Sequence, residues 1–358
     1  MTFQDVLNLR LASQNITEKN AYTPAQVVQA LGAVQAQDYA GSLWSIALRS
    51  KDTYQTAVEQ AIADRTIVRT WPMRGTLHFV AADDVRWMLS LLTPRVRSGM
   101  ERRQKELGLD RNVLNKCQDV LLEALNGGKQ LMRNEVYTIL ENKGITTTAQ
   151  RGIHIINHLA QTQVLCHGCH NDKQPTYVLL DHWIPPSKTL TPEEALAEIT
   201  LRYFTSHGPA TIQDFVWWTG LKVSDARIGI ASVAQHLINS EIDNKVYWYA
   251  PGLRDMKPSK TTFLLSGFDE YILGYTDRTL MVDKMHLPKL VPGNNGMFMP
   301  PVVINGKVEA LWKRTIKKER VIISLFPFHK LSNSTLDKVV RAAQPYGKYL
   351  EMPVDVQM

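Results

Sequence analysis

The sequence predicts an α+β fold in which three tandem winged-helix (helix-turn-helix) units are followed by a small, β-rich, barrel-like C-terminal domain. A run of helical patterns followed by a β-hairpin pattern occurs three times, each time over about 60–80 residues. From about Thr261, short β-rich segments replace the helical patterns. We therefore expect four segments, with a non-repeating α+β domain as the alternative. The segments are residues 1–95, 96–188, 189–256 and 257–358.

The first segment contains several helical patterns and then a hairpin. Apolar residues from Phe3 to Leu11 predict an opening helix. Thr23 before Pro24 is a helix N-cap followed by proline at the first helical position. β-rich residues on both sides of the turn at 72–75 predict a hairpin over 67–80. Further helices are expected at 24–33, 42–49 and 54–63.

The second and third segments repeat this order. A helix at 83–92 and a basic stretch at 95–105 lead into the second segment. Its expected helices lie at 113–125, 134–141 and 150–161, and its expected strands at 164–166 and 176–180. The third segment has expected helices at 192–206, 211–219 and 223–234, and expected strands at 237–242 and 246–249.

The fourth segment is richer in β-formers. It begins with Phe263 and continues over 268–278. Asn305-Gly306 between two β-rich runs predicts a two-residue hairpin turn. The composition favours a small curled sheet or barrel with one helix. The remaining expected elements are strands at 301–304, 307–312 and 320–328 and a helix at 335–349.

Composition and charge restrict the class of protein. The apolar fraction of 44% and the charged fraction of 21% are typical of soluble globular proteins. The longest apolar runs are too short to span a bilayer, no signal-peptide pattern is visible, and three cysteines argue against a disulfide framework. We therefore expect a cytoplasmic protein. The net charge of +7, from 41 basic and 34 acidic residues, permits a polyanionic partner.

The stretch from Gly32 to Asp38 places two amides and a carboxylate between two helical patterns. If the first helix ends before Gln35, then Gln35 and Gln37 share one face of extended chain. Each amide offers one acceptor oxygen and two donor hydrogens, so the pair can hold a water molecule or a backbone group but cannot remove a proton. The alternative is that the amides cap a helix end and Asp38 begins the next turn.

The segment Cys166-His-Gly-Cys169-His170 matches the attachment pattern of c-type haem, and its residue types also suit zinc. Haem attachment belongs to exported chains, and a structural zinc needs four ligands, for which His154 and His158 are candidates. Because the motif falls at the expected turn of the second hairpin, we predict that its residues are structural. We expect no metal and no cofactor.

Basic side chains form three clusters. Hairpin tips with basic side chains can enter a groove of DNA or straddle phosphates. A solvated basic surface is the alternative for any one cluster, but three clusters beside three expected winged helices favour nucleic acid. His78 leaves the first hairpin and is either a structural group or faces the two glutamines. The clusters are Arg65, Arg69 and Arg74; Arg95, Arg97, Arg102, Arg103 and Lys105; and Lys313, Arg314, Lys317, Lys318 and Arg320.

Five motifs, taken together, resemble those of one known family. They are Val34-Gln-Ala-Gln-Asp38, Arg69-Thr-Trp-Pro-Met-Arg-Gly-Thr-Leu-His78, Pro175-Thr-Tyr-Val-Leu-Leu-Asp181, Phe268-Asp-Glu-Tyr-Ile-Leu-Gly-Tyr275 and the hairpin over 296–308. In this order and over nearly the whole chain, they resemble the AlkZ/YcaQ-type winged-helix DNA glycosylases. The resemblance implies three winged helices and a β-rich domain wrapped around duplex DNA. It also implies removal of alkylated purines, including cross-linked ones in the AlkZ branch.

The catalytic signature of that family is Gln, an apolar residue, then Gln or Asp. Gln35-Ala36-Gln37 resembles the AlkZ form, with Ala36 smaller than the usual apolar residue. The resemblance implies that Gln35 and Gln37 are catalytic, and we add Asp38 as an electrostatic stabiliser of the sugar cation. An alkylated purine is cationic and leaves readily, so the remaining task is to position water. The expected DNA-binding residues are Arg69, Arg74, His78, Lys313, Arg314, Lys317 and Lys318.

These observations predict a monofunctional DNA glycosylase that hydrolyses the N-glycosidic bond of N7- or N3-alkylated purines, cross-linked purines included. Its partner is alkylated or cross-linked double-stranded DNA, and we expect a monomer without membrane association. One alternative is a non-catalytic winged-helix DNA-binding protein or transcriptional regulator. Another is a metal or haem protein that uses Cys166 and Cys169.

Overall fold

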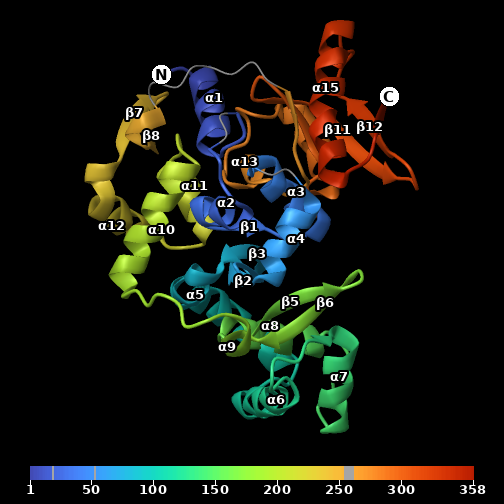
Figure 1. The fold of residues 1–358 in the computed structure, drawn as a ribbon. Coiled ribbons are helices and arrows are strands. Elements are labelled where there is room, and N and C mark those ends of the chain that lie inside the picture. Colours follow the sequence, from blue (N-terminus) through green and yellow to red (C-terminus); the bar gives the residue numbers. More distant parts are fainter. Residues whose placement is uncertain (18–19, 52–53, 254–261) are drawn as a thin grey trace. The chain divides into compact units, whose positions relative to one another are not determined.

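The computed structural model describes residues 1–17, 20–51, 54–253 and 262–358 (Figure 1). The chain packs into two compact units. Unit 1 comprises residues 1–59, 197–218 and 222–358, and unit 2 comprises residues 60–196 and 219–221. The expected division into four segments stays a prediction. Its boundary at 256/257 and the expected start of the fourth segment at Thr261 lie outside the described residues.

The first two helices of unit 1 begin at side-chain caps, of which the sequence predicts the second, Thr23. Thr2 caps α1 (Phe3–Ser13) and Thr23 caps α2 (Pro24–Leu31), each with a reciprocal capping box that satisfies otherwise unpaired N–H groups. Pro24 occupies the first position of α2, where its missing N–H costs no hydrogen bond. The next helices are α3 (Tyr39–Arg49) and α4 (Gln55–Ala63).

A second group of helices is followed by a hairpin, as expected for the third segment. The strands of this hairpin are β7 (Ile238–Ile242) and β8 (Lys245–Tyr249), which pair around Asp243-Asn244. Both turn residues have positive φ, 50° and 57°, which suits a tight hairpin turn. The helices are α10 (Pro192–Ser206), α11 (Ile212–Thr219) and α12 (Val223–Val233).

The C-terminal part of unit 1 is a curled sheet with one long helix against it, as predicted. Within the described residues its strand order is β13-β12-β11-β10-β9. Asn305 and Gly306 both have positive φ, 52° and 84°, so the Asn-Gly signal correctly predicts the turn between β10 and β11. The elements are β9 (Thr262–Leu264), β10 (Pro301–Ile304), β11 (Lys307–Ile316), β12 (Val321–Pro327), α15 (Asn333–Leu350) and β13 (Val354–Gln357).

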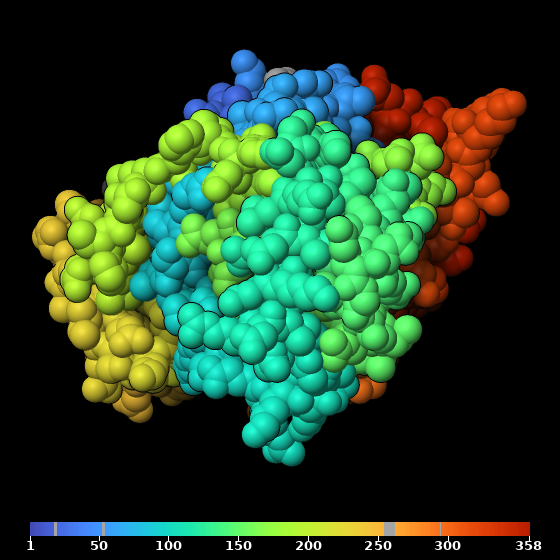
Figure 2. Space-filling view, turned by 90° about the horizontal axis from the view of Figure 1, so that it is seen from below, coloured from blue at the N-terminus to red at the C-terminus, as the bar shows by residue number. Residues whose placement is uncertain are grey.

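Unit 2 contains two hairpins joined edge to edge. In the part of the chain that the structure describes, its strands follow the order β3-β2-β5-β6-β4. Arg69 on β2 pairs with His167 on β5, which joins the two hairpins. Helices α6 and α7 lie at the surface of this unit, green in Figure 2. The elements are β2 (Ile67–Met73), β3 (Thr76–Ala81), α5 (Val85–Glu106), α6 (Arg111–Ala124), β4 (Leu131–Met132), α7 (Arg133–Asn142), α8 (Arg151–Gln161), β5 (Leu165–Asn171), β6 (Gln174–Leu179) and α9 (Leu180–Trp183).

Three expectations about secondary structure were wrong. The helix expected at 83–92 is α5, which continues through Pro94 and the basic stretch because it packs along β2 and thereby offsets one missing hydrogen bond. The segment from Cys166 to His170 lies within β5, and the turn falls at Asp172-Lys173. The β-rich stretch 268–278 contains a short helix, α13 (Glu270–Leu273), which Asp269 caps.

Helices therefore precede a hairpin in each of the three places predicted, and their assignment as three winged helices stays a prediction. Among the described residues, no helix combines the length and the apolar character that crossing a membrane requires.

Candidate active site

The stretch that carries the two glutamines connects α2 to α3. Gly32 ends α2 with φ 82°, a conformation that favours glycine, and the chain then extends as β1 (Val34–Gln35). The helix therefore ends before Gln35, as the functional interpretation of the sequence requires. Gln35 is 8% exposed, and Gln37 is exposed. The buried Gln35 thus ends the strand, and the exposed Gln37 lies two residues later, in the bend before α3.

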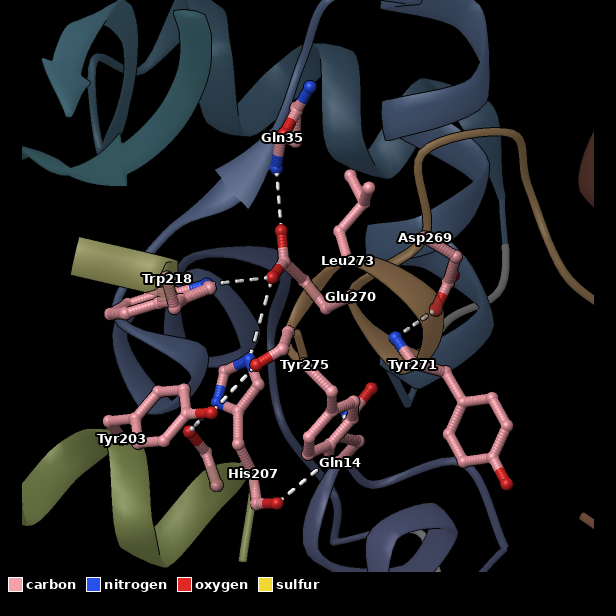
Figure 3. Close-up of polar contacts among 12 residues, drawn as sticks. Gln14, Gln35, Tyr203, His207, Trp218, Asp269, Glu270, Tyr271, Leu273 and Tyr275 are labelled. Atoms are coloured by element: carbon pink, nitrogen blue, oxygen red, sulfur yellow. Dashed lines mark hydrogen bonds and ion pairs between the residues drawn. The ribbon is translucent and has the colours of Figure 1, made fainter. Parts of the chain in front are cut away.

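Glu270 holds the main chain of Gln35 from within unit 1. The N–H of Gln35 donates to Oε1 of Glu270 at 2.9 Å, and the glutamate is completely buried. Figure 3 shows this contact at the main-chain end of Gln35, with the side-chain amide nitrogen at the opposite end of the residue. The carboxylate therefore fixes the backbone of Gln35.

Two aromatic side chains hold the second oxygen of Glu270. The indole N–H of Trp218 donates to Oε2 at 2.9 Å, and Nε2 of His207 lies 3.5 Å from the same oxygen (Figure 3). Both are completely buried. Several N–H donors together replace the water that a carboxylate loses on burial. The glutamate is thus solvated by the protein itself.

The surroundings of His207 favour its neutral imidazole. Burial lowers its pKa below the ordinary value of 6.5, and the hydrogen bond and charge of Glu270 oppose that effect. The imidazole stacks on Tyr203 with ring centroids 4.7 Å apart, and Oγ of Ser206 lies 2.8 Å from Nδ1. His207 is therefore held on both ring nitrogens and one face.

A buried ion pair anchors the chain next to Glu270. The guanidinium of Arg49, at the end of α3, meets both oxygens of Asp269, at 2.8 and 3.0 Å. Arg49 also donates to the carbonyl and side-chain oxygens of Gln14, at 2.9 and 3.0 Å. Both charged groups are completely inaccessible. These bonds connect α1, α3 and the start of α13.

Asp38 lies at the start of α3, as the alternative interpretation of the sequence proposes. It is the N-cap residue but makes no side-chain capping bond. A Cβ atom at position 41 would lie 2.5 Å from its Oδ2, so glycine at that position leaves room for the carboxylate. Burial raises the pKa of Tyr346 to about 12, Arg314 lowers it and Asp38 raises it, so both charges lie near that hydroxyl.

The β11–β12 hairpin carries the four predicted DNA-binding residues of unit 1. Lys313, Lys317 and Lys318 are exposed, and Arg314 is half-buried. The two views agree that the end of the β11–β12 hairpin projects beyond its sheet (Figures 1 and 2). Three exposed cations on a projecting hairpin suit contact with phosphates.

The predicted basic residues of unit 2 lie on the β2–β3 hairpin. Arg69 is 8% exposed and pairs across the strands with Phe79, while Arg74 has φ 53° in the turn. His78 is completely buried, and its Nδ1 lies 2.9 Å from the carbonyl oxygen of Thr76. This contact with Thr76 supports a structural role for His78. DNA contact by the three residues stays a prediction.

The thiols of unit 2 are poor metal ligands as they stand. Burial raises the pKa of Cys117 to about 11 and raises that of Cys166 further, which favours the protonated thiol. No three His, Cys, Asp or Glu side chains within the described ranges gather closely enough to hold a metal ion.

Sequence reasoning missed Glu270, His207 and Trp218 as parts of the site. One signal was present: Asp269 and Glu270 stand together inside an otherwise apolar stretch, and buried carboxylates need specific partners. The partners themselves are far away in sequence, and Gln35 precedes Glu270 by 235 positions.

Comparisons with known proteins show the family to which this chain belongs. The family model described as "DNA glycosylase AlkZ-like" matches residues 28–349. The chain is 24% identical over 340 residues, 91% of each chain, to a Streptomyces sahachiroi protein named "Interstrand DNA cross-link repair glycosylase". Its fold is similar to the solved structure of Streptomyces sahachiroi DNA glycosylase AlkZ, with a TM-score of 0.82, 22% identity and 99% coverage of both chains. The chain belongs to the AlkZ-like DNA glycosylase family.

Proposed function

We propose that this protein is a monofunctional glycosylase that hydrolyses the N-glycosidic bond of N7- or N3-alkylated purines in duplex DNA. One observation carries the proposal. Gln35 ends the short strand β1 and Gln37 lies two residues later, before α3, and the backbone of Gln35 is fixed by a buried carboxylate. Two amides held in this way are suited to orienting a water molecule.

The chemistry follows from the leaving group. When the bond between C1′ and the purine breaks, its electron pair neutralises the positive charge of the alkylated base. Positive charge then develops on the sugar, where water attacks C1′ and releases its proton to solvent. Gln35 and Gln37 position that water, and the carboxylate of Asp38 stabilises the sugar cation. The stretch from Gln35 to Asp38 offers no amine for covalent attack, which favours the monofunctional reaction.

DNA contact falls to the basic side chains. We propose that Lys313, Arg314, Lys317 and Lys318 contact phosphates from the projecting hairpin and that Arg74 contributes from unit 2, where the buried Arg69 and His78 support the β2–β3 hairpin that carries it. Phosphate contacts of this kind position a duplex without reading its sequence. The name of the Streptomyces relative extends the proposed substrates to purines in interstrand cross-links.

Release of 7-methylguanine from methylated duplex DNA tests this function. The wild-type protein should release the base, and Gln37→Ala should release it about a hundredfold more slowly, because the water loses its orientation. Gln29→Ala, which changes an exposed glutamine of α2, is the matched control and should keep the wild-type rate. No release by the wild-type protein, together with tight duplex binding, would favour a non-catalytic DNA-binding protein instead.

A further inference from the structure

We propose that Glu270 is the positioning residue of this active site: its buried carboxylate sets the place of Gln35, and Trp218 and His207 hold that carboxylate. The inference rests on the proposed glycosylase function. It gives a role in catalysis to residues that do not touch the reacting atoms.

The two oxygens of Glu270 bind different parts of unit 1. Oε1 accepts the main-chain N–H of Gln35, in the loop between α2 and α3, at 2.9 Å. Oε2 accepts from Trp218 at 2.9 Å and faces Nε2 of His207 at 3.5 Å. One oxygen therefore faces the loop, and the other is fastened to α10 and α11 (Figure 3).

The aromatic side chains that hold Oε2 of Glu270 are tightly packed. Trp218 and His207 are each completely buried, and their rings lie 5.1 Å apart. Tyr203 stacks on His207 and donates its hydroxyl hydrogen to the carbonyl of Gly274, at 2.6 Å, just beyond α13. The helix that carries Glu270 is thus bound at its end to the aromatic group that holds its carboxylate. A side chain held on this many sides has few positions available.

The proposed reaction requires that Gln35 be accurately positioned. Gln35 lies in a two-residue strand between the ends of α2 and α3, and Glu270 accepts the main-chain N–H of Gln35 itself. A misplacement of about 1 Å in a group that orients a reactant can cost about a hundredfold in rate. A buried charge accepting a main-chain N–H is among the stronger hydrogen bonds available to a protein. Glu270 supplies that restraint to the main chain of Gln35.

The test compares two substitutions of Glu270 that preserve size. Glu270→Gln removes the charge but keeps an oxygen within reach of the Gln35 N–H. Glu270→Met removes the acceptor and leaves that buried N–H without its bond. Single-turnover release of 7-methylguanine should therefore fall about tenfold for Glu270→Gln and about a hundredfold for Glu270→Met. The Kd for the same duplex should stay within about twofold, since the loop is positioned for the transition state.

Asp214→Asn is the matched control for loss of a buried carboxylate. Asp214 is 2% exposed, accepts the N–H groups of Thr211 and Thr276 at 2.9 Å, and lies near Arg10. Its replacement should lower the midpoint of urea unfolding but leave the single-turnover rate of the folded protein unchanged. If Asp214→Asn and Glu270→Met slowed release equally, or if Glu270→Met released the base at the wild-type rate, the inference would be overturned.

Amide hydrogen exchange separates this inference from the proposed function, because it needs no substrate. The N–H of Gln35 should exchange faster in Glu270→Met than in the wild-type protein, and Asp214→Asn should not change it. Faster exchange in a protein that releases no base would support the placement of Gln35 by Glu270 and refute the glycosylase function. A working glycosylase in which neither exchange nor rate responds to Glu270 would refute the inference alone.

Discussion

At the scale of single residues, the buried charged side chains in the core of unit 1 lie next to groups that offset their charge. Asp269 faces the guanidinium of Arg49, and Asp214 faces that of Arg10, whose guanidinium lies 3.6 Å above the ring of Tyr275. Glu270 is instead surrounded by N–H donors. A buried charge is tolerated only with such partners, so each pair imposes one arrangement of the elements it joins.

The pair of Arg49 and Asp269 supports a prediction about stability. Arg49→Met removes the cation and leaves the Asp269 carboxylate buried without its partner, which should lower the free energy of unfolding by about 3–5 kcal/mol. Replacing both, as Arg49→Met with Asp269→Leu, should recover most of that loss. Urea unfolding of the three proteins measures this. A double variant as unstable as the single one would show that the charge pairing is not the cause.

The sequence predicted the two amides but not what fixes them. Gln35 and Gln37 stand out because two amides two residues apart after a helix-ending glycine form a local pattern. Glu270 and His207 lie far from that stretch in the sequence, and only the tertiary fold brings them to Gln35. A single buried glutamate or histidine forms no repeating pattern in the sequence, so an analysis of periodicity cannot identify it.

At the scale of elements, the ends of α2 and α3 define the catalytic loop. Gly32 ends α2 with φ 82°, and a Cβ there would lie 3.2 Å from Cη2 of Trp218 and 3.4 Å from Cδ of Arg202. The same tryptophan that holds Glu270 therefore also limits how the helix can end.

Gly32→Ala should be costlier than an ordinary substitution of a glycine with positive φ. Strain in the left-handed region alone costs about 1–2 kcal/mol. Crowding against Trp218 adds to it and should also slow base release. Gly296→Ala is the control, since its φ is 75° and no atom lies within 4 Å of its added Cβ. Urea midpoints and excision rates of both variants give the comparison, and equal losses at the two positions would contradict the role of Trp218.

The β11–β12 hairpin supports a prediction about DNA binding. Replacing Lys317 and Lys318 by Gln should weaken binding to all duplexes alike and flatten the plot of log K against log salt by about 0.9 per lost phosphate contact. Lys284→Gln with Lys330→Gln makes the same change of net charge elsewhere on unit 1 and should alter the slope less. A sequence-selective footprint, or an unchanged slope, would count against electrostatic binding by the hairpin.

Secondary structure was predicted well where local signals decide it. The N-cap Thr23 and the following Pro24 correctly predict the start of α2, and Asn305-Gly306 correctly predicts the turn between β10 and β11. The continuation of α5 through Pro94 was not predicted, because packing on β2 outweighs a local helix breaker. The strand through Cys166 and His170 was missed for a similar reason, since its pairing with β6 involves a register shift after His167.

At the scale of the whole molecule, titration of the histidines governs how stability depends on pH. Burial is the largest cause that lowers the pKa of each of five histidines below the ordinary value of 6.5, and that of His170 falls to about 4. The unfolded chain therefore binds more protons than the folded protein below pH 6.5. The five are His154, His158, His167, His170 and His207.

The free energy of unfolding should consequently fall as the pH drops from about 6.5 towards 4, and this contribution should be fully present above pH 6.5. The urea midpoint should be lower at pH 5 than at pH 7.5. His170→Gln removes one of the groups that titrate and should make the midpoint less dependent on pH. A midpoint that is equal or higher at pH 5 would contradict this account of the buried histidines.

The central claim is that two amides on one loop perform the hydrolysis, and single-turnover release of 7-methylguanine from methylated duplex DNA tests it most directly. The double variant Gln35→Ala, Gln37→Ala should fold, bind the duplex nearly as the wild-type protein does, and release the base at least about a hundredfold more slowly. Gln37→Asp should keep partial activity, because a carboxylate can also hold the water. Release at the wild-type rate by the folded double variant would contradict the assignment.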